Sequence, residues 1–247
     1  MKTQMLIAML MSTLGGLGCL QAQGASPVPG QQIEQRFETS DAVQVSYLLY
    51  LPEGYKSGTR PWPLMLFLHG RGESNGPLSL VSKWGPPRMA ARGDQMPYIL
   101  VSPQCPPDDA WRTPSQQSRL VELLDLIIKT YDVDEDRIYV TGLSMGGSGS
   151  WRLAADHPDR FAAIVPICGR GDPSDVDRLK GLPIWVFIGD QDRGFQQSRE
   201  MVEAIKGAGA ETIRFTILEH IGHNCWSAAY ATPDLYQWLG RQTRAKE

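Results

Sequence analysis

"VTGLSMGGSGSW", residues Val140–Trp151, places one serine among small residues, directly after a run that has the composition of a β-strand. Inside it, Gly142–Gly146 reads G-x-S-x-G, with "RIYV" before it and a segment of helix length after it. A serine in this motif occupies a sharp strand-to-helix turn with strained dihedral angles, where side chains two places away would collide. The stretch therefore predicts that Ser144 is a nucleophile at the carboxyl edge of a sheet. The alternative interpretation is a serine hydroxyl in a glycine-rich loop.

Apolar runs of strand length continue on both sides of this turn. "WPLMLFLHG" (62–70) precedes it, and "FAAIVPIC" (161–168) and "PIWVFIGD" (183–190) follow it. The segment 115–133, "SQQSRLVELLDLIIKTYDV", carries its leucines and isoleucines on one helical face. Strands that are apolar throughout and alternate with helices are typical of a parallel sheet covered on both sides. We therefore predict an α/β fold with a mainly parallel, twisted sheet of about eight strands and helices on both faces.

Length and charge favour one globular domain without a basic surface. The chain has 247 residues, of which 42% are hydrophobic and 21% charged, and this is enough for a sizeable core. The connection 169–182 is too short to hold a large lid domain. The formal net charge is -3, and no cluster of lysine and arginine is interleaved with aromatic residues. Nucleic acid is therefore not an expected partner.

The first 24 residues differ in composition from the rest of the chain. A lysine at the second position is followed by Met5–Leu20, which is mostly apolar or small, and then by "QAQGASPVPG". This pattern is typical of a secretory signal peptide, with cleavage after Ala22 or Gly24, and the apolar run is short for a membrane span. We predict a signal peptide at 1–24, one catalytic domain at 25–247, and a periplasmic or secreted protein.

The cysteines leave two questions open. "GLGC", ending at Cys19, loosely resembles a bacterial lipoprotein signal, so lipid anchoring at that residue is an alternative to simple export. Beyond the leader the chain has Cys105, Cys168 and Cys225, which allow one disulfide and a free thiol, or no disulfide. No group of cysteines and histidines has metal-ligand spacing, so no structural zinc is expected. A serine nucleophile activated by a base requires neither a metal nor an organic cofactor, so no cofactor is expected.

A serine needs a base to take its proton, and the chain has four histidines. His69 follows a buried strand and His157 ends the helix after the serine, so both are interpreted as structural. His220 and His223, in "EHIGHNCW", follow the last predicted strand, where a sheet of this kind presents its final catalytic residue. His223 is preceded by glycine and lies further out on the loop, and we favour it as the base.

A carboxylate on the other imidazole nitrogen would fix the tautomer and orientation of that base. "IWVFIGDQD" ends a buried strand with Asp190 and Asp192, in the order serine, acid, histidine. Spacing alone does not choose between them. Asp190, so close to the strand, suits a capping or turn role, and we favour Asp192 as the acid.

When a serine attacks a carbonyl group, the carbonyl oxygen becomes an oxyanion that needs hydrogen-bond donors, and the substrate needs a pocket. The backbone N–H of Met145 is one expected donor, and the amide of Arg71, in the loop after "LMLFLHG", is the other. Trp111 and Trp226 follow strand ends and are candidates for an aromatic wall of the pocket, with ordinary packing as the alternative.

The motifs together resemble the α/β-hydrolase superfamily, and within it the small bacterial carboxylesterases often labelled predicted peptidases or phospholipase/carboxylesterase-like proteins. The resemblance runs from "YLPEGY" through "PLMLFLHGRGESNG", "DEDRIYVTGLSMGG" and "PIWVFIGDQD" to "GHNCW". It implies a Ser144, Asp192 and His223 triad and an oxyanion hole from the amides of Arg71 and Met145. The family loop usually has a small residue where Arg71 stands, so this arginine would place a charge beside the substrate entrance.

This resemblance implies a serine carboxylic-ester hydrolase that forms an acyl-enzyme. An exported protein without a lid would present an open cleft, and acetyl or feruloyl esters of plant polysaccharides are expected substrates, together with small soluble esters. A serine peptidase of the same fold is an alternative, and a non-catalytic binding protein is a second one.

Overall fold

The computed structural model describes residues 23–244 of the chain. The predicted leader therefore lies outside the described residues except for its end, Gln23–Gly24, which forms the short strand β1. This strand pairs antiparallel with β2. Among the described residues, no helix is long and apolar enough to cross a membrane.

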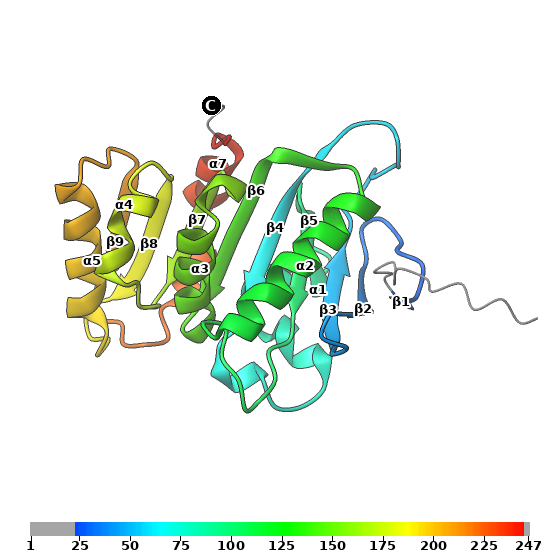
Figure 1. Ribbon diagram of the computed structural model, residues 1–247, viewed down its shortest axis with the longest axis horizontal. Helices are drawn as coiled ribbons and strands as arrows, with labels where there is room; N and C mark the ends of the chain where they lie inside the picture. Colours follow the sequence, from blue (N-terminus) through cyan, green and yellow to red (C-terminus); the bar gives the residue numbers. More distant parts are fainter. Residues whose placement is uncertain (1–22, 245–247) are drawn as a thin grey trace, which may run out of the picture.

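A nine-stranded sheet runs through the molecule in the order β1-β2-β3-β5-β4-β6-β7-β8-β9 (Figure 1). Pairing is antiparallel from β1 to β5 and parallel from β5 onward. The prediction of a mainly parallel sheet of about eight strands is confirmed, and β1 is the additional, two-residue strand. After β1 the strands are β2 Gln32–Glu38, β3 Gln44–Tyr50, β4 Trp62–Leu68, β5 Ile99–Pro103, β6 Val133–Leu143, β7 Ala163–Ile167, β8 Ile184–Gly189 and β9 Ile213–Leu218.

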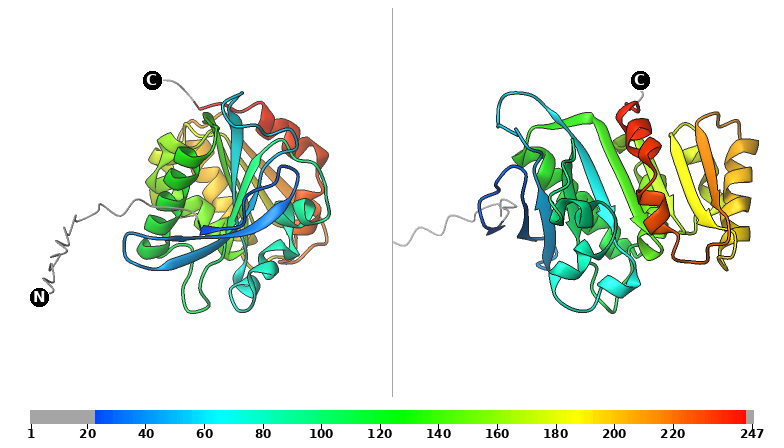
Figure 2. Two further views of the ribbon diagram at one scale, coloured as in Figure 1. Left: turned by 90° about the vertical axis from the view of Figure 1, so that its right-hand side faces the viewer. Right: turned by 180° about the vertical axis from the view of Figure 1, so that it is seen from behind.

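Helices cover both faces of this sheet. Helices α2, α3, α4 and α5 pack on one face, and α1, α6 and α7 pack on the other (Figures 1 and 2). Between β7 and β8 the chain forms only the 3-10 turn η4, Pro173–Asp175, and the one-turn helix α4. The helices are α1 Gly85–Ala91, α2 Pro114–Thr130, α3 Met145–Asp156, α4 Val176–Leu179, α5 Phe195–Gly207, α6 Trp226–Tyr230 and α7 Pro233–Gly240.

Strand β4 shows why the central strands are apolar without alternation. Leu64 and Leu66 belong to the core under α2 and α3, whereas Met65 and Phe67 belong to the core on the opposite face. All four side chains are at most 1% exposed. A parallel strand covered by helices on both sides must be apolar at every position, and the continuous run at 62–70 follows from this.

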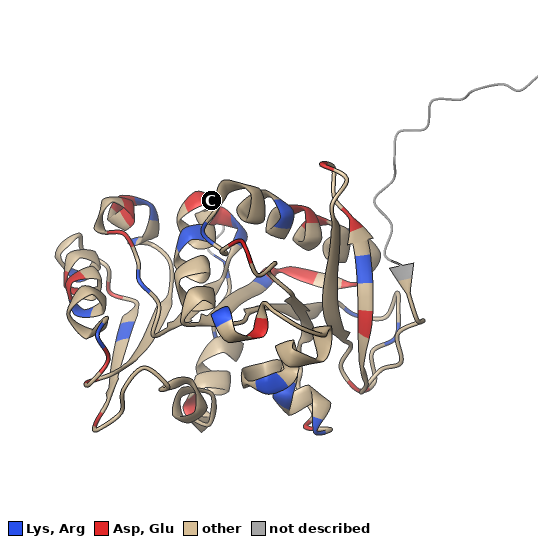
Figure 3. Cartoon of the chain, turned by 90° about the horizontal axis from the view of Figure 1, so that it is seen from below, with Lys and Arg blue, Asp and Glu red and all other residues tan. Residues whose placement is uncertain are grey.

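Positions with Lys or Arg and positions with Asp or Glu are interspersed along the described chain (Figure 3). The carboxyl ends of the parallel strands meet at one edge of the sheet, the lower edge in Figure 1. In open sheets of this kind, ligands bind in the crevice outside those ends. The loops that follow β4, β6, β7, β8 and β9 are therefore the place to look for a site.

Candidate active site

Ser144 occupies the turn between β6 and α3. Its φ of 54° and ψ of -112° lie outside the regions that side-chain-bearing residues prefer. A conformation of this kind costs about 1–3 kcal/mol and persists only where the surroundings impose it. The Ser144 N–H donates to the Ile167 carbonyl at 2.9 Å, which ties the turn to the end of β7. The structure thus places the serine on the strained strand-to-helix turn that its motif predicts.

The glycines on either side of Ser144 are required by close backbone contacts. A Cβ on Gly142 would lie 2.5 Å from the Gly146 carbonyl group, and a Cβ on Gly146 would lie 1.8 Å from the Leu68 oxygen. Both neighbours are backbone atoms, which cannot move aside as a side chain can. Absence of a side chain at these two positions allows α3 to start directly against the end of β4.

Gly146→Ala should destabilise the fold, because its methyl group would overlap the backbone of Leu68. We expect the free energy of unfolding to fall by about 3 kcal/mol, the upper part of the range for overpacked sites. Gly207→Ala is the matched control, since nothing lies within 4 Å of a Cβ at that end of α5. Denaturant titration of both variants checks this, and equal midpoints would contradict it.

A hydrogen-bonded relay joins Ser144 to His223 and Asp192. The Ser144 Oγ lies 2.8 Å from His223 Nε2, and His223 Nδ1 lies 2.7 Å from Asp192 Oδ2. The three residues come from the β6–α3 turn, the loop after β9 and the loop after β8. The Asp192 side chain is 4% exposed, whereas that of His223 is 53% exposed. The buried carboxylate can therefore orient an imidazole whose other side faces solvent.

The loop after β8 separates the roles of the two candidate aspartates. Asp192 accepts a second hydrogen bond on Oδ1 from the Gly194 N–H at 2.6 Å. Asp190 is exposed, and its Oδ1 accepts from the Ile221 N–H at 3.3 Å. Asp192 is thus the aspartate that reaches the imidazole, and Asp190 ties the two loops together.

These hydrogen bonds define one productive tautomer for His223. An ionised Asp192 accepts the Nδ1 proton, so Nε2 carries a lone pair that accepts from the serine hydroxyl. His220 is exposed on the same loop and has a φ of 59°. Among the described residues, only His223 of the four histidines forms a hydrogen bond with Ser144.

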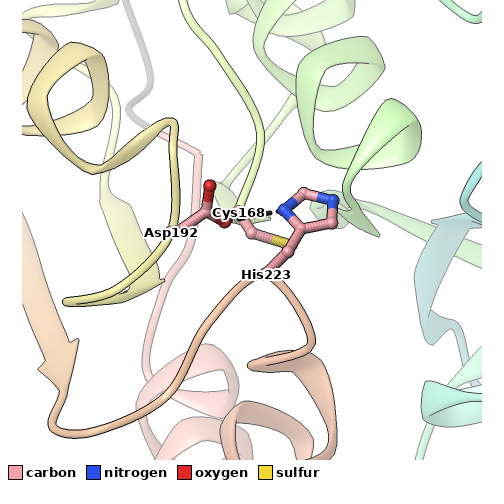
Figure 4. Close-up of side chains that lie close together, drawn as sticks. All are labelled: Cys168, Asp192 and His223. Atoms are coloured by element: carbon pink, nitrogen blue, oxygen red, sulfur yellow. Dashed lines mark hydrogen bonds and ion pairs between the residues drawn. The ribbon is translucent and has the colours of Figure 1, made fainter.

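Cys168, at the end of β7, lies beside this pair (Figure 4). Its Sγ and the ligand atoms of Asp192 and His223 lie within 4.8 Å of one another, so these three residues are the described group that could hold a metal. A hydrogen bond with Cys225 and then burial raise the pKa of Cys168 well above its usual range. Both nitrogens of His223 are engaged by Ser144 and Asp192 in this arrangement. Cys105, Cys168 and Cys225 are all free thiols in the structure.

The two predicted oxyanion donors lie where β4 and β6 end. Met145 is the first residue of α3, so its N–H has no acceptor within the helix. Arg71 is the first residue of η1, Arg71–Glu73, and follows β4 after His69 and Gly70. The Arg71 guanidinium donates to the carbonyls of Pro107 and Asp109, which fixes the side chain against the loop after β5.

The two predicted pocket tryptophans lie in different environments. Trp226 is partly exposed, and its ring lies 5.7 Å from that of His223 and 5.9 Å from that of Trp84. Trp111 is only 1% exposed, and its indole N–H donates to the His69 carbonyl at 2.9 Å. The placement of Trp111 on the pocket wall is therefore corrected, because its ring fills the core between β4 and α3.

His69 connects the loops around the site. It is 1% exposed; Nδ1 bonds to the Gly70 carbonyl at 2.6 Å, and Nε2 accepts from the Cys105 N–H at 3.0 Å. This pattern requires a neutral imidazole with its proton on Nδ1. Burial lowers the pKa of His69 to about 4, and the nearby Arg71 charge acts in the same direction. The interpretation of His69 as structural agrees with these contacts.

A neutral buried His69 should make the protein less stable in acid. The unfolded chain binds this proton with a pKa near 6.5 and the folded chain with a pKa of about 4, so stability falls as pH drops from 6.5 to 4. The shift corresponds to about 3 kcal/mol of unfolding free energy. In His69→Gln, which retains an acceptor for the Cys105 N–H, this part of the pH dependence should disappear. Denaturant titrations from pH 4 to 7 check this, and parallel curves for both proteins would contradict it.

Three further residues surround the site without having been singled out by their motifs. Arg170 follows Cys168 by two positions, and Arg193 follows Asp192 directly. Both arginines and Cys168 line a cavity next to His223. The sequence places both arginines just after strand-end motifs, which is where the residues of a site are expected. Which of these loops meet at the site is decided by the order of the strands in the sheet.

Comparisons with known proteins show the family of this chain. The family model described as "Putative esterase" matches residues 42–239. The chain is 28% identical over 182 residues to "Putative esterase NocK" of Nocardia uniformis subsp. tsuyamanensis, over 68% of this chain and 52% of that protein. It is 24% identical over 179 residues to acetylxylan esterase A of Emericella nidulans, over 68% of this chain and 56% of that protein. The chain thus spans about half the length of these two relatives.

Among solved structures, that of a thermostable esterase is similar with a TM-score of 0.77 and 30% identity. The similarity covers 87% of this chain and 64% of that one. It confirms the fold class that the sequence motifs imply. Because the family model matches most of its length, the chain belongs to the esterase family of the α/β-hydrolase superfamily.

Proposed function

We propose that this chain hydrolyses carboxylic esters through an acyl-enzyme on Ser144. The observation that carries the proposal is the continuous relay from the Ser144 Oγ through the imidazole of His223 to the buried carboxylate of Asp192. Nucleophile, base and orienting acid are the three groups that acyl transfer by serine requires.

In the first step, the Ser144 Oγ attacks the ester carbonyl carbon while His223 Nε2 takes the hydroxyl proton. A C–O bond forms to the serine, and the carbonyl oxygen becomes an oxyanion. The amides of Met145 and Arg71 are the proposed donors to it, and each such donor contributes about 3–4 kcal/mol in other enzymes. The C–O bond to the leaving alcohol then breaks, and the alcohol departs with the proton from Nε2.

In the second step, water replaces the alcohol. His223 takes a proton from the water, which attacks the acyl carbon, and returns it to the Ser144 Oγ as the acid is released. Asp192 stays ionised throughout and stabilises the imidazolium that forms twice per turnover. Its burial and its bond from the Gly194 N–H hold it in place for this role.

The proposed substrates are acetyl or feruloyl esters of plant polysaccharides, together with small soluble esters. Two observations support this choice. Sequence similarity to a protein named acetylxylan esterase A points to acetylated sugars. Trp226 lies edge to face with both His223 and Trp84, which gives an aromatic acyl group such as ferulate a surface to pack on.

The test is an ester panel of 4-nitrophenyl acetate, butyrate and octanoate, acetylated xylan and methyl ferulate. We expect turnover of the short nitrophenyl esters and of at least one of the last two. Wild-type protein should also be labelled on Ser144 by a fluorophosphonate, and Ser144→Ala should not. Failure to turn over any ester would exclude the esterase proposal, whereas labelling without ester turnover would favour a serine peptidase.

A further inference from the structure

A cavity of about 360 Å³ lies directly against His223. It is formed between the end of β7 and the loop that joins β8 to α5, the segments that carry Cys168 and Asp192 in Figure 4. An ester held at the Ser144 Oγ would extend one of its two arms into this space. The lining residues are Cys168, Arg170, Gln191, Asp192, Arg193, Gly194 and His223.

The two arginines in this lining differ from most arginines of residues 23–244. Most of those others pair with a carboxylate or lie over a tryptophan ring. Neither Arg170 nor Arg193 has an ion pair or a ring contact through its side chain, and both are exposed. Arginines with an acidic partner are Arg92, Arg119, Arg137, Arg152, Arg160, Arg178, Arg199 and Arg244, and those over a tryptophan are Arg60, Arg88 and Arg214.

The one carboxylate that lines the cavity bonds to groups other than the two arginines. Asp192 Oδ2 bonds to His223 and Asp192 Oδ1 accepts from the Gly194 N–H, and among the described residues no ion pair joins Asp192 to Arg170 or Arg193. The Arg170 Nε lies 3.8 Å from the position of a Cβ on Gly194, which places this guanidinium over the backbone of the Asp192 loop. Arg71, on the other side of the serine, is already bonded to two carbonyls. Arg170 and Arg193 are thus the cations of the site that are free to meet a ligand.

We propose that Arg170 and Arg193 form an anion subsite, and that the substrates of this chain are esters with a carboxylate on the arm that enters the cavity. A guanidinium binds a carboxylate through two parallel N–H···O bonds, so the pair suits a carboxylated acyl chain or a uronate sugar as the alcohol. This inference rests on the proposed ester hydrolysis at Ser144, and it narrows the substrate class.

The experiment compares matched neutral and anionic esters. Mono-4-nitrophenyl glutarate against 4-nitrophenyl butyrate tests the acyl arm, and 4-acetoxybenzoate against 4-acetoxybenzamide tests the alcohol arm. We expect wild-type protein to prefer the anionic member of at least one pair in kcat/KM, mainly through KM. Raising the salt concentration to about 0.5 M should weaken that preference, because exposed charges are screened.

Variants assign the preference to the two arginines. Arg170→Ala and Arg193→Ala should each lower kcat/KM for the preferred anionic ester about 10-fold, the size expected for one charge-assisted contact. In both variants kcat/KM for the matched neutral ester should change less than about twofold. Arg170→Lys should retain part of the preference for the anionic ester, because lysine keeps the positive charge. Arg199→Ala is the charge-matched control, since Arg199 lies on α5 and pairs with Glu203.

Two results would overturn the subsite. The first is a wild-type protein that hydrolyses the neutral esters but prefers the anionic member of neither pair. This result would exclude the anion subsite and would leave the proposed ester hydrolysis at Ser144 unaffected. The other is an Arg170→Ala, Arg193→Ala double variant that loses neutral and anionic activity equally. No turnover of any ester would overturn both the subsite and the proposed function.

Discussion

Ser144→Ala is expected to lower kcat for 4-nitrophenyl acetate by about a millionfold, the loss seen when the nucleophile of other serine hydrolases is removed. The hydroxyl within 2.8 Å of His223 Nε2 is the atom that forms the acyl bond, and alanine has no replacement for it. Residual turnover would come from the oxyanion donors and substrate positioning alone. Steady-state kinetics, with active-site titration of the wild type, give the ratio of the two kcat values.

Folding must be controlled in that experiment, because position 144 has a φ of 54°. Alanine is subject to the same backbone strain as serine, so the melting temperature should stay within a few degrees of the wild type. Ser148→Ala offers a matched control: its hydroxyl lies on the same helix and accepts from the Arg170 N–H rather than bonding to His223. A Ser144→Ala protein that keeps more than about a hundredth of the activity would show that another residue is the nucleophile.

Asp192→Asn is expected to lower kcat by about 10⁴-fold, with little change in the fold. An asparagine amide that donates to Nδ1 holds the imidazole in the tautomer with its proton on Nε2. That tautomer cannot accept the serine proton, so the base is lost while the geometry is kept. The effect depends on the 2.7 Å contact between His223 Nδ1 and Asp192 Oδ2.

Asp190→Asn is the control that makes this result specific. Asp190 belongs to the same loop and receives only the Ile221 N–H, which an asparagine oxygen can also accept. We expect its activity to stay within about threefold of the wild type, because the residue does not touch the imidazole. Equal losses in the two variants would contradict the assignment of Asp192 and point to a general effect on the loop.

Much of the fold could be predicted from local patterns. The apolar runs, the helix face at 115–133 and the strand-turn-helix around Ser144 each reflect a rule that acts within a few residues. Gly142 and Gly146 belong to this class, since the motif demands them before any partner is known. The contacts that explain them, with backbone atoms of Gly146 and of Leu68 on β4, become visible only in the structure.

Pairings between distant loops could be predicted only in part. Strand-end position and the order serine, acid, histidine favour His223 as the base and leave Asp190 and Asp192 as candidates for the acid. The structure joins His223 to Ser144 and to Asp192 by hydrogen bonds. Trp111 was placed incorrectly, because a position after a strand end does not tell whether a large ring faces the cleft or the core. The indole N–H bond to the His69 carbonyl is a contact over 42 residues that no local pattern encodes.

The sequence by itself determined the class of sheet, the strained turn and the types of residue that perform the chemistry, because periodicity and steric limits are local. The tertiary structure alone decided that Asp192 rather than Asp190 meets His223, that Cys168 lies beside them, and that Arg170 and Arg193 share one cavity. These facts depend on the strand order β6-β7-β8-β9, which brings loops separated by tens of residues to one edge. The strand order is selected by the burial of apolar faces over the whole chain. It therefore cannot be predicted from any single segment of the sequence.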